Sequence, residues 1–222
     1  MTSIGPIDAL IRLTVVLIFA LIAIASKSID KRGFLASVFV GYSILIGGGW
    51  EWFAVVATFF TLGGGFTYYK YEYKESLGSA QEKGGARNWP NIIANGGVAA
   101  VLGLCQLVFG GSIFAIMYLG AMAAAAADTV ATEVGLLSHS SPRLVTRLRM
   151  RVSPGTSGGV TALGFIGSLL ASLTIGILAL VVGVVDGGVK LIVVALFGGV
   201  VGSLGDRLLG ADVQRKGYCT GC

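Results

Sequence analysis

The stretch RVSPGTSGGVTALGFIGSLLASLTIGILALVV, residues 151–182, changes character within a few positions. It begins as a basic, hydroxyl-rich loop and continues as a run of apolar residues without a charge. About 20 such residues are enough for an α-helix to cross the hydrocarbon core of a bilayer. The stretch therefore predicts a helix that enters a membrane from a polar, glycine-rich loop.

The same alternation of apolar segments and polar loops continues through all 222 residues. Apolar residues make up 55% of the chain and charged residues 12%, too few to cover the apolar surface of a soluble protein. We therefore expect residues 1–222 to form a single integral membrane domain of the all-α class, a polytopic helix bundle surrounded by membrane lipids.

Seven apolar segments are expected to cross the membrane. They cover approximately residues 6–26, 33–50, 52–69, 91–109, 112–136, 159–184 and 189–209. The first of them contains Arg12, and we interpret it as a retained span rather than a cleaved signal.

Positive charge predicts the orientation of these spans. Fourteen of the sixteen Lys and Arg residues lie in loops 27–32, 70–90 and 138–158 and in the tail 207–222. Because such loops stay in the cytoplasm, the N-terminus is expected outside and the C-terminus inside. Anionic lipid headgroups account for the net charge of +5. Nucleic acid is not expected as a partner, because no basic helix with interleaved aromatics occurs.

Four polar segments gather on the predicted cytoplasmic side. They are GSAQEKGGARNWPNIIANGG (78–97), AAAAADTVATEVG (123–135), SPGTSGG (153–159) and GSLGDRLLGADVQRKG (202–217). The fourth and sixth spans begin on this side, so the N–H groups and positive dipole ends of their helices face the same layer. Helix ends preceded by glycine are suited to bind phosphate.

The loop 153–159 is therefore a candidate anion nest; the alternative is a plain glycine-rich start of a tightly packed helix. Its candidate phosphate-binding residues are Ser153, Gly155, Thr156, Ser157, Gly158 and Gly159.

Carboxylates occur near the cytoplasmic ends of two spans. Asp128 shares a helical face with Thr132, and Asp206 follows Ser203 by about one turn. Mg²⁺ prefers one or two carboxylates together with phosphate oxygens and water, so Asp128 and Asp206 are the predicted metal ligands. The alternative for each is a salt bridge to a neighbouring arginine. Glu133 lies about 140° around the helix from Asp128 and need not join that site.

The loop before the fourth span carries further groups for a phosphate. Arg87 is suited to hold phosphate oxygens in bidentate fashion, and Asn91 and Asn95 share one helical face. Asn88 belongs to the same segment, as does Lys83, which is either a ligand or a solvated loop charge. Together these features predict a site for a phosphorylated compound on one membrane face, beside a bundle that suits a lipid.

Two cysteines near the end of the sequence, Cys219 and Cys222, form a C-x-x-C pair. Such a pair is half of a zinc-ribbon ligand set. Because no second pair follows it, no zinc site made by this chain alone is expected. His139, the only histidine, is interpreted as a solvent-exposed residue.

The four quoted segments resemble the domain of unknown function 92 family, which holds transmembrane protein 19 and the plant phytyl-phosphate kinase. The likeness extends from about residue 30 to the end of the chain. The resemblance implies a Mg²⁺-dependent kinase that transfers a phosphoryl group from CTP or ATP, with CTP favoured, to an isoprenyl monophosphate. It places the active site at the cytoplasmic face of the membrane, which for a prokaryotic member is the cell membrane.

The resemblance also implies which residues carry the function. The expected catalytic residues are Asp128, Glu133 and Arg87, and the other motif residues that it implies are Asp206, Asn88, Asn91, Asn95 and the loop 153–159. In this mechanism the acceptor is already an anion and needs no strong base, so positioning and charge neutralisation supply most of the catalysis.

Two other functions fit the same residues. A kinase for a prenyl alcohol would need a base, and Glu133 could serve as that base. A transporter or flippase would also carry intramembrane carboxylates and glycine-broken helices, but its polar sites are expected near the membrane midplane. A CDP-alcohol phosphotransferase is disfavoured because its multi-aspartate helix motif is absent from the sequence.

Overall fold

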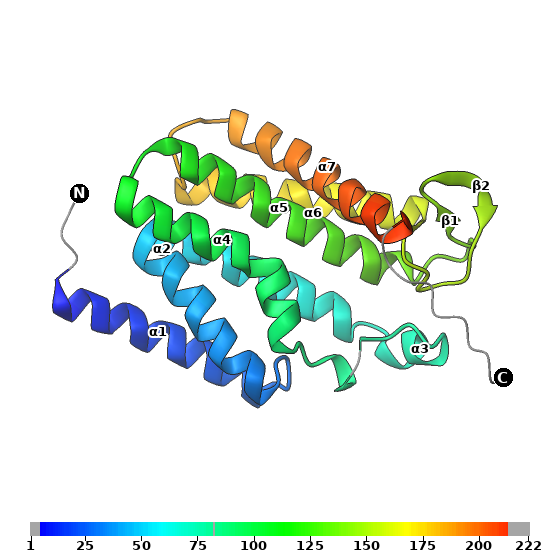
Figure 1. The fold of residues 1–222 in the computed structure, drawn as a ribbon, viewed down its shortest axis with the longest axis horizontal. Coiled ribbons are helices and arrows are strands. Elements are labelled where there is room, and N and C mark those ends of the chain that lie inside the picture. Colours follow the sequence, from blue (N-terminus) through cyan, green and yellow to red (C-terminus); the bar gives the residue numbers. More distant parts are fainter. Residues whose placement is uncertain (1–4, 82, 213–222) are drawn as a thin grey trace.

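The computed structural model describes residues 5–81 and 83–212, and this part of the chain is mostly helical (Figure 1). The helices are α1 (Pro6–Ala25), α2 (Lys31–Tyr68), α3 (Tyr71–Ser76), η1 (Lys83–Gly85), α4 (Trp89–Phe109), α5 (Ser112–Gly135), α6 (Ala162–Val182) and α7 (Lys190–Asp212). The expected helix bundle is confirmed. The pair Cys219 and Cys222 and the side chain of Lys83 lie outside the described part.

Helix α2 consists of two antiparallel arms that meet at Gly49. The backbone there has φ 80° and ψ −170°, a positive φ that favours glycine. A Cβ on Gly41 would lie 3.7 Å from Cε2 of Phe53, although residues twelve apart in a straight helix are separated by about 18 Å. The chain therefore turns back within α2, between the predicted spans 33–50 and 52–69.

Six helices among the described residues are long and apolar enough to cross a membrane, and α2 counts once among them. When the two arms of α2 are counted separately, the described residues offer seven candidate spans, the number that the sequence predicts. Two bounds differ. Helix α6 begins at Ala162 because Thr161 caps it, with its Oγ1 accepting from the Gly164 N–H at 3.0 Å. Helix α7 continues to Asp212, where the sequence predicts a tail from residue 207.

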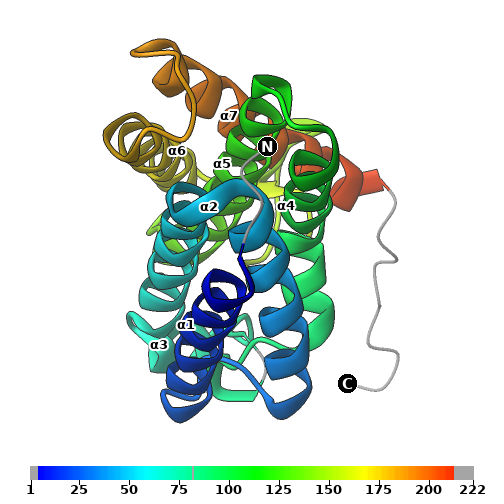
Figure 2. The ribbon, with the colours of Figure 1, turned by 90° about the vertical axis from the view of Figure 1, so that its left-hand side faces the viewer.

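The helices lie side by side, with α1 at one edge of the bundle and α6 and α7 at the other (Figures 1 and 2). Helices α2, α4 and α5 fill the space between them. The long polar connections, with α3, β1 and β2, lie at the right-hand end in Figure 1, and the tight turns lie at the opposite end. Polar and short connections thus alternate between the ends; which end faces the cytoplasm stays a prediction.

The connection between α5 and α6 contains a small antiparallel sheet that the sequence does not predict. Its strands are β1 (Arg143–Leu144), β2 (Arg147–Arg151) and β3 (Gly159–Val160), in the order β2-β1-β3. Two of the strands have only two residues, so no period of alternation is long enough to reveal them.

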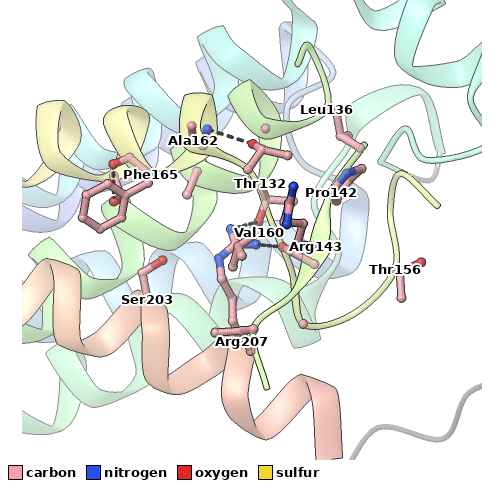
Figure 3. A pocket seen from close by; sticks show the side chains of 18 of the residues that line it. Thr132, Leu136, Pro142, Arg143, Thr156, Val160, Ala162, Phe165, Ser203 and Arg207 are labelled. Carbon is pink, nitrogen blue, oxygen red and sulfur yellow. Dashed lines mark hydrogen bonds between the residues drawn. The ribbon is translucent and has the colours of Figure 1, made fainter. Parts of the chain in front are cut away.

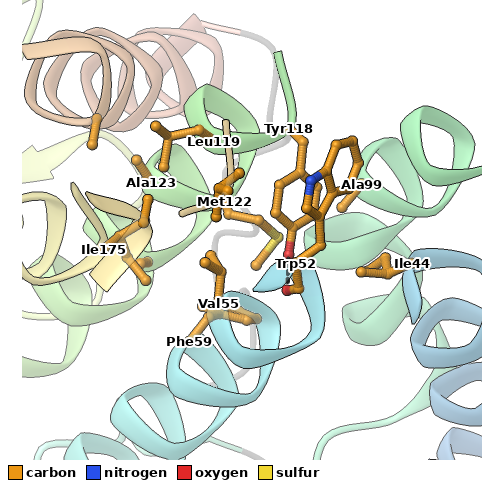
Figure 4. Close-up of a cluster of buried hydrophobic side chains, with 14 of the residues drawn as sticks. Ile44, Trp52, Val55, Phe59, Ala99, Tyr118, Leu119, Met122, Ala123 and Ile175 are labelled. Carbon is orange, nitrogen blue, oxygen red and sulfur yellow. Dashed lines mark hydrogen bonds between the residues drawn. The ribbon is translucent and has the colours of Figure 1, made fainter. Parts of the chain in front are cut away.

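Helix α5 lies at the centre of the bundle and packs against α2, α4, α6 and α7. Its Tyr118 is fully buried and stacks on Trp52 of α2, with 4.1 Å between ring centroids (Figure 4). The Tyr118 hydroxyl donates to the Trp52 carbonyl at 2.6 Å, which satisfies the polar end of a buried aromatic ring. The alanines at 123–127 allow the neighbouring helices to approach α5 closely.

Glycine permits the close crossing of α2 and α4. A Cβ on Gly47 would overlap the carbonyl group of Gly103. We expect Gly47→Ala to lower the stability of the protein in detergent by about 1–3 kcal/mol, because the helices must move apart. Gly64→Ala is the matched control, since its Cβ would meet nothing within 4 Å. Thermal unfolding should show a lower Tm for Gly47→Ala only; equal Tm values would contradict the crossing.

Candidate functional site

A cavity of about 950 Å³ lies between α5, α6, α7 and the sheet-bearing connection, at the end of the bundle that carries the long polar loops. Predicted site residues from three separate segments meet in its lining (Figure 3). They are Asp128 of α5, Asp206 of α7, and Gly155, Thr156, Ser157, Gly158 and Gly159 of the loop. We call this space the main cavity.

Arg207 joins three parts of the main cavity. Its Nη1 donates to the Gly159 carbonyl at 2.6 Å and its Nη2 donates to Thr132 Oγ1 at 3.2 Å. Nη2 also lies 3.7 Å from Oδ1 of Asp128. Figure 3 shows Arg207 reaching from α7 toward Thr132. The guanidinium therefore holds α7 to both α5 and the loop, and it is the arginine partner that the sequence left as an alternative for Asp128.

The two aspartates offer oxygen ligands on one side of the main cavity. Asp128 is paired with Arg207 and accepts from Ser203 Oγ at 3.5 Å, yet its side chain remains 32% exposed. Asp206 is exposed at the same lining. Within residues 5–81 and 83–212 no group of three or more His, Cys, Asp or Glu gathers. This ligand set fits Mg²⁺ that is completed by phosphate oxygens and water, rather than a closed protein cage.

The loop 153–159 packs on the end of α7. Gly158 has φ 78°, and a Cβ there would lie 3.0 Å from the Arg207 carbonyl oxygen and overlap Ala211. Two amides of the expected nest are already used, since Thr156 N–H donates to Ser153 O at 3.1 Å and Gly159 N–H to Thr156 O at 2.9 Å. The backbone N–H groups of the loop that remain available to an anion are therefore those of Gly155, Ser157 and Gly158. Ser153 is exposed and lies outside the lining.

Besides Arg207, three further titratable residues of the lining were not among the predicted site residues. Arg143 and Arg151 are brought to the cavity by the sheet, and His139 lies at its edge. From the sequence, a role in topology is the first interpretation of Arg143 and Arg151, and contact with a polyanion is the alternative. Their positive charge makes the main cavity suitable for a polyanion.

Glu133 lies on the opposite side of α5 from Asp128. Its Oε2 accepts from Lys74 Nζ at 2.6 Å and its Oε1 from Thr67 Oγ1 at 3.0 Å. Lys74 is only 1% exposed and also donates to the Thr67 carbonyl at 3.3 Å, near the end of α2. The ion pair thus ties α5 to α2 and α3. Glu133 is outside the main cavity lining, as the angle between the two carboxylates implies.

Arg87 lies with Asn91 and Asn95 in a second, smaller cavity between α1, α2 and α4. Its side chain is 9% exposed, and its guanidinium carbon lies 5.4 Å and 5.7 Å from the ring centroids of Phe59 and Phe60. Burial lowers the pKa of Arg87, while the charges of Glu133 and Tyr68 raise it. Burial thus disfavours the charged form, although an arginine remains protonated at neutral pH.

The asparagines of this segment have local roles in α4. Asn88 caps the helix, with its Oδ1 accepting from the Asn91 N–H at 3.1 Å. Asn95 Nδ2 donates to the Asn91 carbonyl at 2.8 Å, within the same helix. Phosphate binding by Asn88, Asn91 or Asn95 stays a prediction, and the structure places these residues apart from Asp128 and Asp206.

Comparison with known proteins agrees with this architecture. The family described as integral membrane protein DUF92 matches residues 14–222. The chain belongs to this family. An uncharacterized membrane protein of Methanocaldococcus jannaschii is 30% identical over 219 residues, which cover 97% of this chain and 89% of the relative. No solved structure matches the chain.

Two plant relatives of this DUF92 chain come from Arabidopsis thaliana. Protein PGR is 31% identical over 92% of this chain and 80% of its own length. Protein VTE6, chloroplastic, is 28% identical over 74% of this chain and 50% of its own length. The family is therefore shared by an archaeon and a plant.

The ion pair between Lys74 and Glu133 is expected to stabilise the fold. Lys74→Met leaves a buried carboxylate without its cation and should lower stability by about 3–5 kcal/mol. The double variant Lys74→Met/Glu133→Leu should recover part of this loss, because no charge remains buried there and the Thr67 hydroxyl still reaches the Gly63 carbonyl. Thermal unfolding in detergent measures the Tm of the single and the double variant. If Lys74→Met unfolds at the same Tm as wild type, the ion pair does not stabilise the fold.

Proposed function

We propose that this protein is a Mg²⁺-dependent phosphotransferase that uses a nucleoside triphosphate, with CTP favoured over ATP, to convert an isoprenyl monophosphate into its diphosphate. The observation that carries the proposal is the convergence of Asp128, Asp206 and Arg207 with a glycine-rich loop in one large cavity. The resemblance of the four motifs to the family that holds the plant phytyl-phosphate kinase supports the choice of acceptor.

The main cavity has both a polar and a lipid-facing side. Arg143, Arg151 and Arg207 supply positive charge for phosphates. Phe165 of α6 and Leu148 of β2 also line the cavity and are 46% and 59% exposed. Helix α6 is one of the candidate membrane spans, so Phe165 would give a prenyl tail an apolar contact next to the lipid. A substrate with a phosphate head and a prenyl tail suits this combination.

In the proposed reaction, an oxygen of the acceptor monophosphate attacks the γ-phosphorus of the nucleotide. The bond between that phosphorus and the β–γ bridging oxygen breaks, and the nucleoside diphosphate leaves with the electron pair. Arg207 and the free amides of the loop hold the phosphoryl oxygens, which places the reactants in line and offsets the charge that is spread over them. The acceptor is an anion, so no residue needs to remove a proton.

Asp128 and Asp206 are the residues that would hold Mg²⁺, which when bound neutralises charge on the nucleotide phosphates. The Asp128–Arg207 pair keeps this carboxylate positioned toward α7. Glu133 lies outside the lining and is bonded to Lys74, so it is poorly placed to act as the base that an alcohol acceptor needs. The prenyl-alcohol alternative would therefore need a base other than Glu133, and His139 of the cavity lining is the residue that could serve.

The decisive assay uses the purified protein in detergent with Mg²⁺, geranylgeranyl monophosphate and γ-labelled CTP or ATP in parallel. Wild type should form labelled prenyl diphosphate, and Asp128→Asn should reduce the rate by about 100-fold or more, because phosphate charge is no longer neutralised. Free geranylgeraniol in a companion reaction tests the alcohol alternative. The better donor identifies the nucleotide.

Asp186→Asn is the matched control, because Asp186 is an exposed aspartate in the α6–α7 turn at the other end of the bundle. It should leave the rate unchanged. If folded wild-type protein labels neither acceptor with either nucleotide, the kinase proposal is wrong, and the transporter alternative should then be tested with the same lipid in vesicles.

A further inference from the structure

The second cavity is separate from the main cavity, and none of the residues that the structure describes lines both. It lies between α1, the two arms of α2 and the start of α4. Its volume of about 70 Å³ is several times what one water molecule needs. Arg87, Asn91 and Asn95 provide its polar groups, and the rest of its lining is mostly apolar.

The Arg87 side chain is held in this cavity from two directions. Its backbone is fixed because its N–H donates to the Ser28 carbonyl at 2.9 Å, and its carbonyl accepts from the Asp30 N–H at 3.1 Å. On the side-chain end, a Cβ on Gly63 would overlap Nη2 of Arg87, so glycine leaves the room that the guanidinium occupies. The backbone hydrogen bonds and the space left by Gly63 therefore hold the Arg87 side chain inside the second cavity.

The Arg87 guanidinium has N–H donors that no described residue uses. Within the described residues it makes ring contacts with Phe59 and Phe60 but no hydrogen bond or ion pair, although an arginine carries five N–H donors. Glu133, whose charge acts on Arg87, is bonded to Lys74 and Thr67. Lys74, Glu133 and Arg87 together carry a net charge of +1, so one anion would neutralise this buried group.

The lining of the second cavity is polar at one end and apolar along the rest of its length, as a lipid is. Arg87 and Asn91 lie at the polar end of the bundle, where α1 ends and α4 begins. Along α1 the lining continues from Ala23 to Val16, about 10 Å deeper at 1.5 Å per residue. On the second arm of α2 it continues in the same direction from Phe60 to Phe53. A headgroup at Arg87 would thus have its tail directed toward the membrane interior.

We propose that the second cavity binds the phosphate headgroup of an anionic membrane lipid at Arg87 and Asn91, with the lipid tail following α1 and the second arm of α2. A phosphate presents acceptor oxygens, which the guanidinium can hold in bidentate fashion, and the N-terminal end of α4 favours a negative charge there. This lipid is a bound partner of the bundle and is independent of the proposed phosphotransfer.

The test measures the Tm of the purified protein in detergent micelles that contain dioleoyl phosphatidic acid, dioleoyl phosphatidylcholine or no lipid. Phosphatidic acid should raise the wild-type Tm by about 5 °C relative to phosphatidylcholine, because a ligand of the folded state stabilises it by mass action. Arg87→Met should reduce this shift to less than half. Inorganic phosphate without lipid, at the same concentration, should give no shift.

Arg149→Met is the matched control, since Arg149 is an exposed arginine at the same end of the bundle and lines neither cavity. It should keep the full shift. If it loses as much as Arg87→Met, the effect is general surface attraction and the proposal is overturned. It is equally overturned if phosphatidic acid and phosphatidylcholine act alike on wild type, or if inorganic phosphate alone gives the full shift.

A second variant covers the case in which Arg87→Met does not fold. Asn91→Leu removes a polar side chain from the lining without breaking a hydrogen bond between helices, because the contacts of Asn91 are made by its backbone. It should fold and show a reduced shift with phosphatidic acid. An unchanged shift in Asn91→Leu would contradict headgroup binding in the second cavity.

Arg87→Lys keeps the positive charge and should retain part of the shift. A complete loss of the shift in Arg87→Lys would also contradict headgroup binding there.

Discussion

Helix α5 carries two carboxylates on opposite faces, and in a bilayer each of them must find a cation inside the protein. Asp128 finds Arg207 on α7, and Glu133 finds Lys74 on α3. These pairs lie at the contacts of α5 with α7 and with α3, and they help to hold these two elements on different sides of α5. The small residues of α5 then allow close contact on both faces.

The two faces of α5, one with Asp128 and the other with Glu133, differ in how accessible their charges are. On the Asp128 side the carboxylates stay partly open, and arginines and a glycine-rich loop surround a large space. On the Glu133 side the ion pair is closed, since Lys74 is almost completely buried and also bonds to a carbonyl near the end of α2. One face of α5 therefore leaves its charges available, and the other uses its charges to hold helices together.

Much of the fold was predictable because a membrane imposes it. Apolar length and the positions of Lys and Arg are enough to predict seven crossings and their alternation. Asp128, Asp206 and the loop 155–159 were expected together and do meet. The resemblance also placed Arg87 with them, but sequence position alone does not reveal that Arg87 packs among α1, α2 and α4. For Glu133, the angle of about 140° from Asp128 already indicated a separate place. The sheet was missed although β2 alternates charged and apolar residues and pairs with β1 across a two-residue turn. The two-residue strands β1 and β3 carry no such pattern.

The two cavities draw on separate parts of the chain. Residues 16–96 line the second cavity, whereas residues 128–207 line the main cavity. A ribosome delivers the chain from its N-terminus, and membrane domains assemble as their segments emerge. Helix α1, both arms of α2 and α4 can thus enclose the second cavity before α5, α6 and α7 are made. The main cavity closes only when α7 has been inserted and Arg207 can reach Asp128.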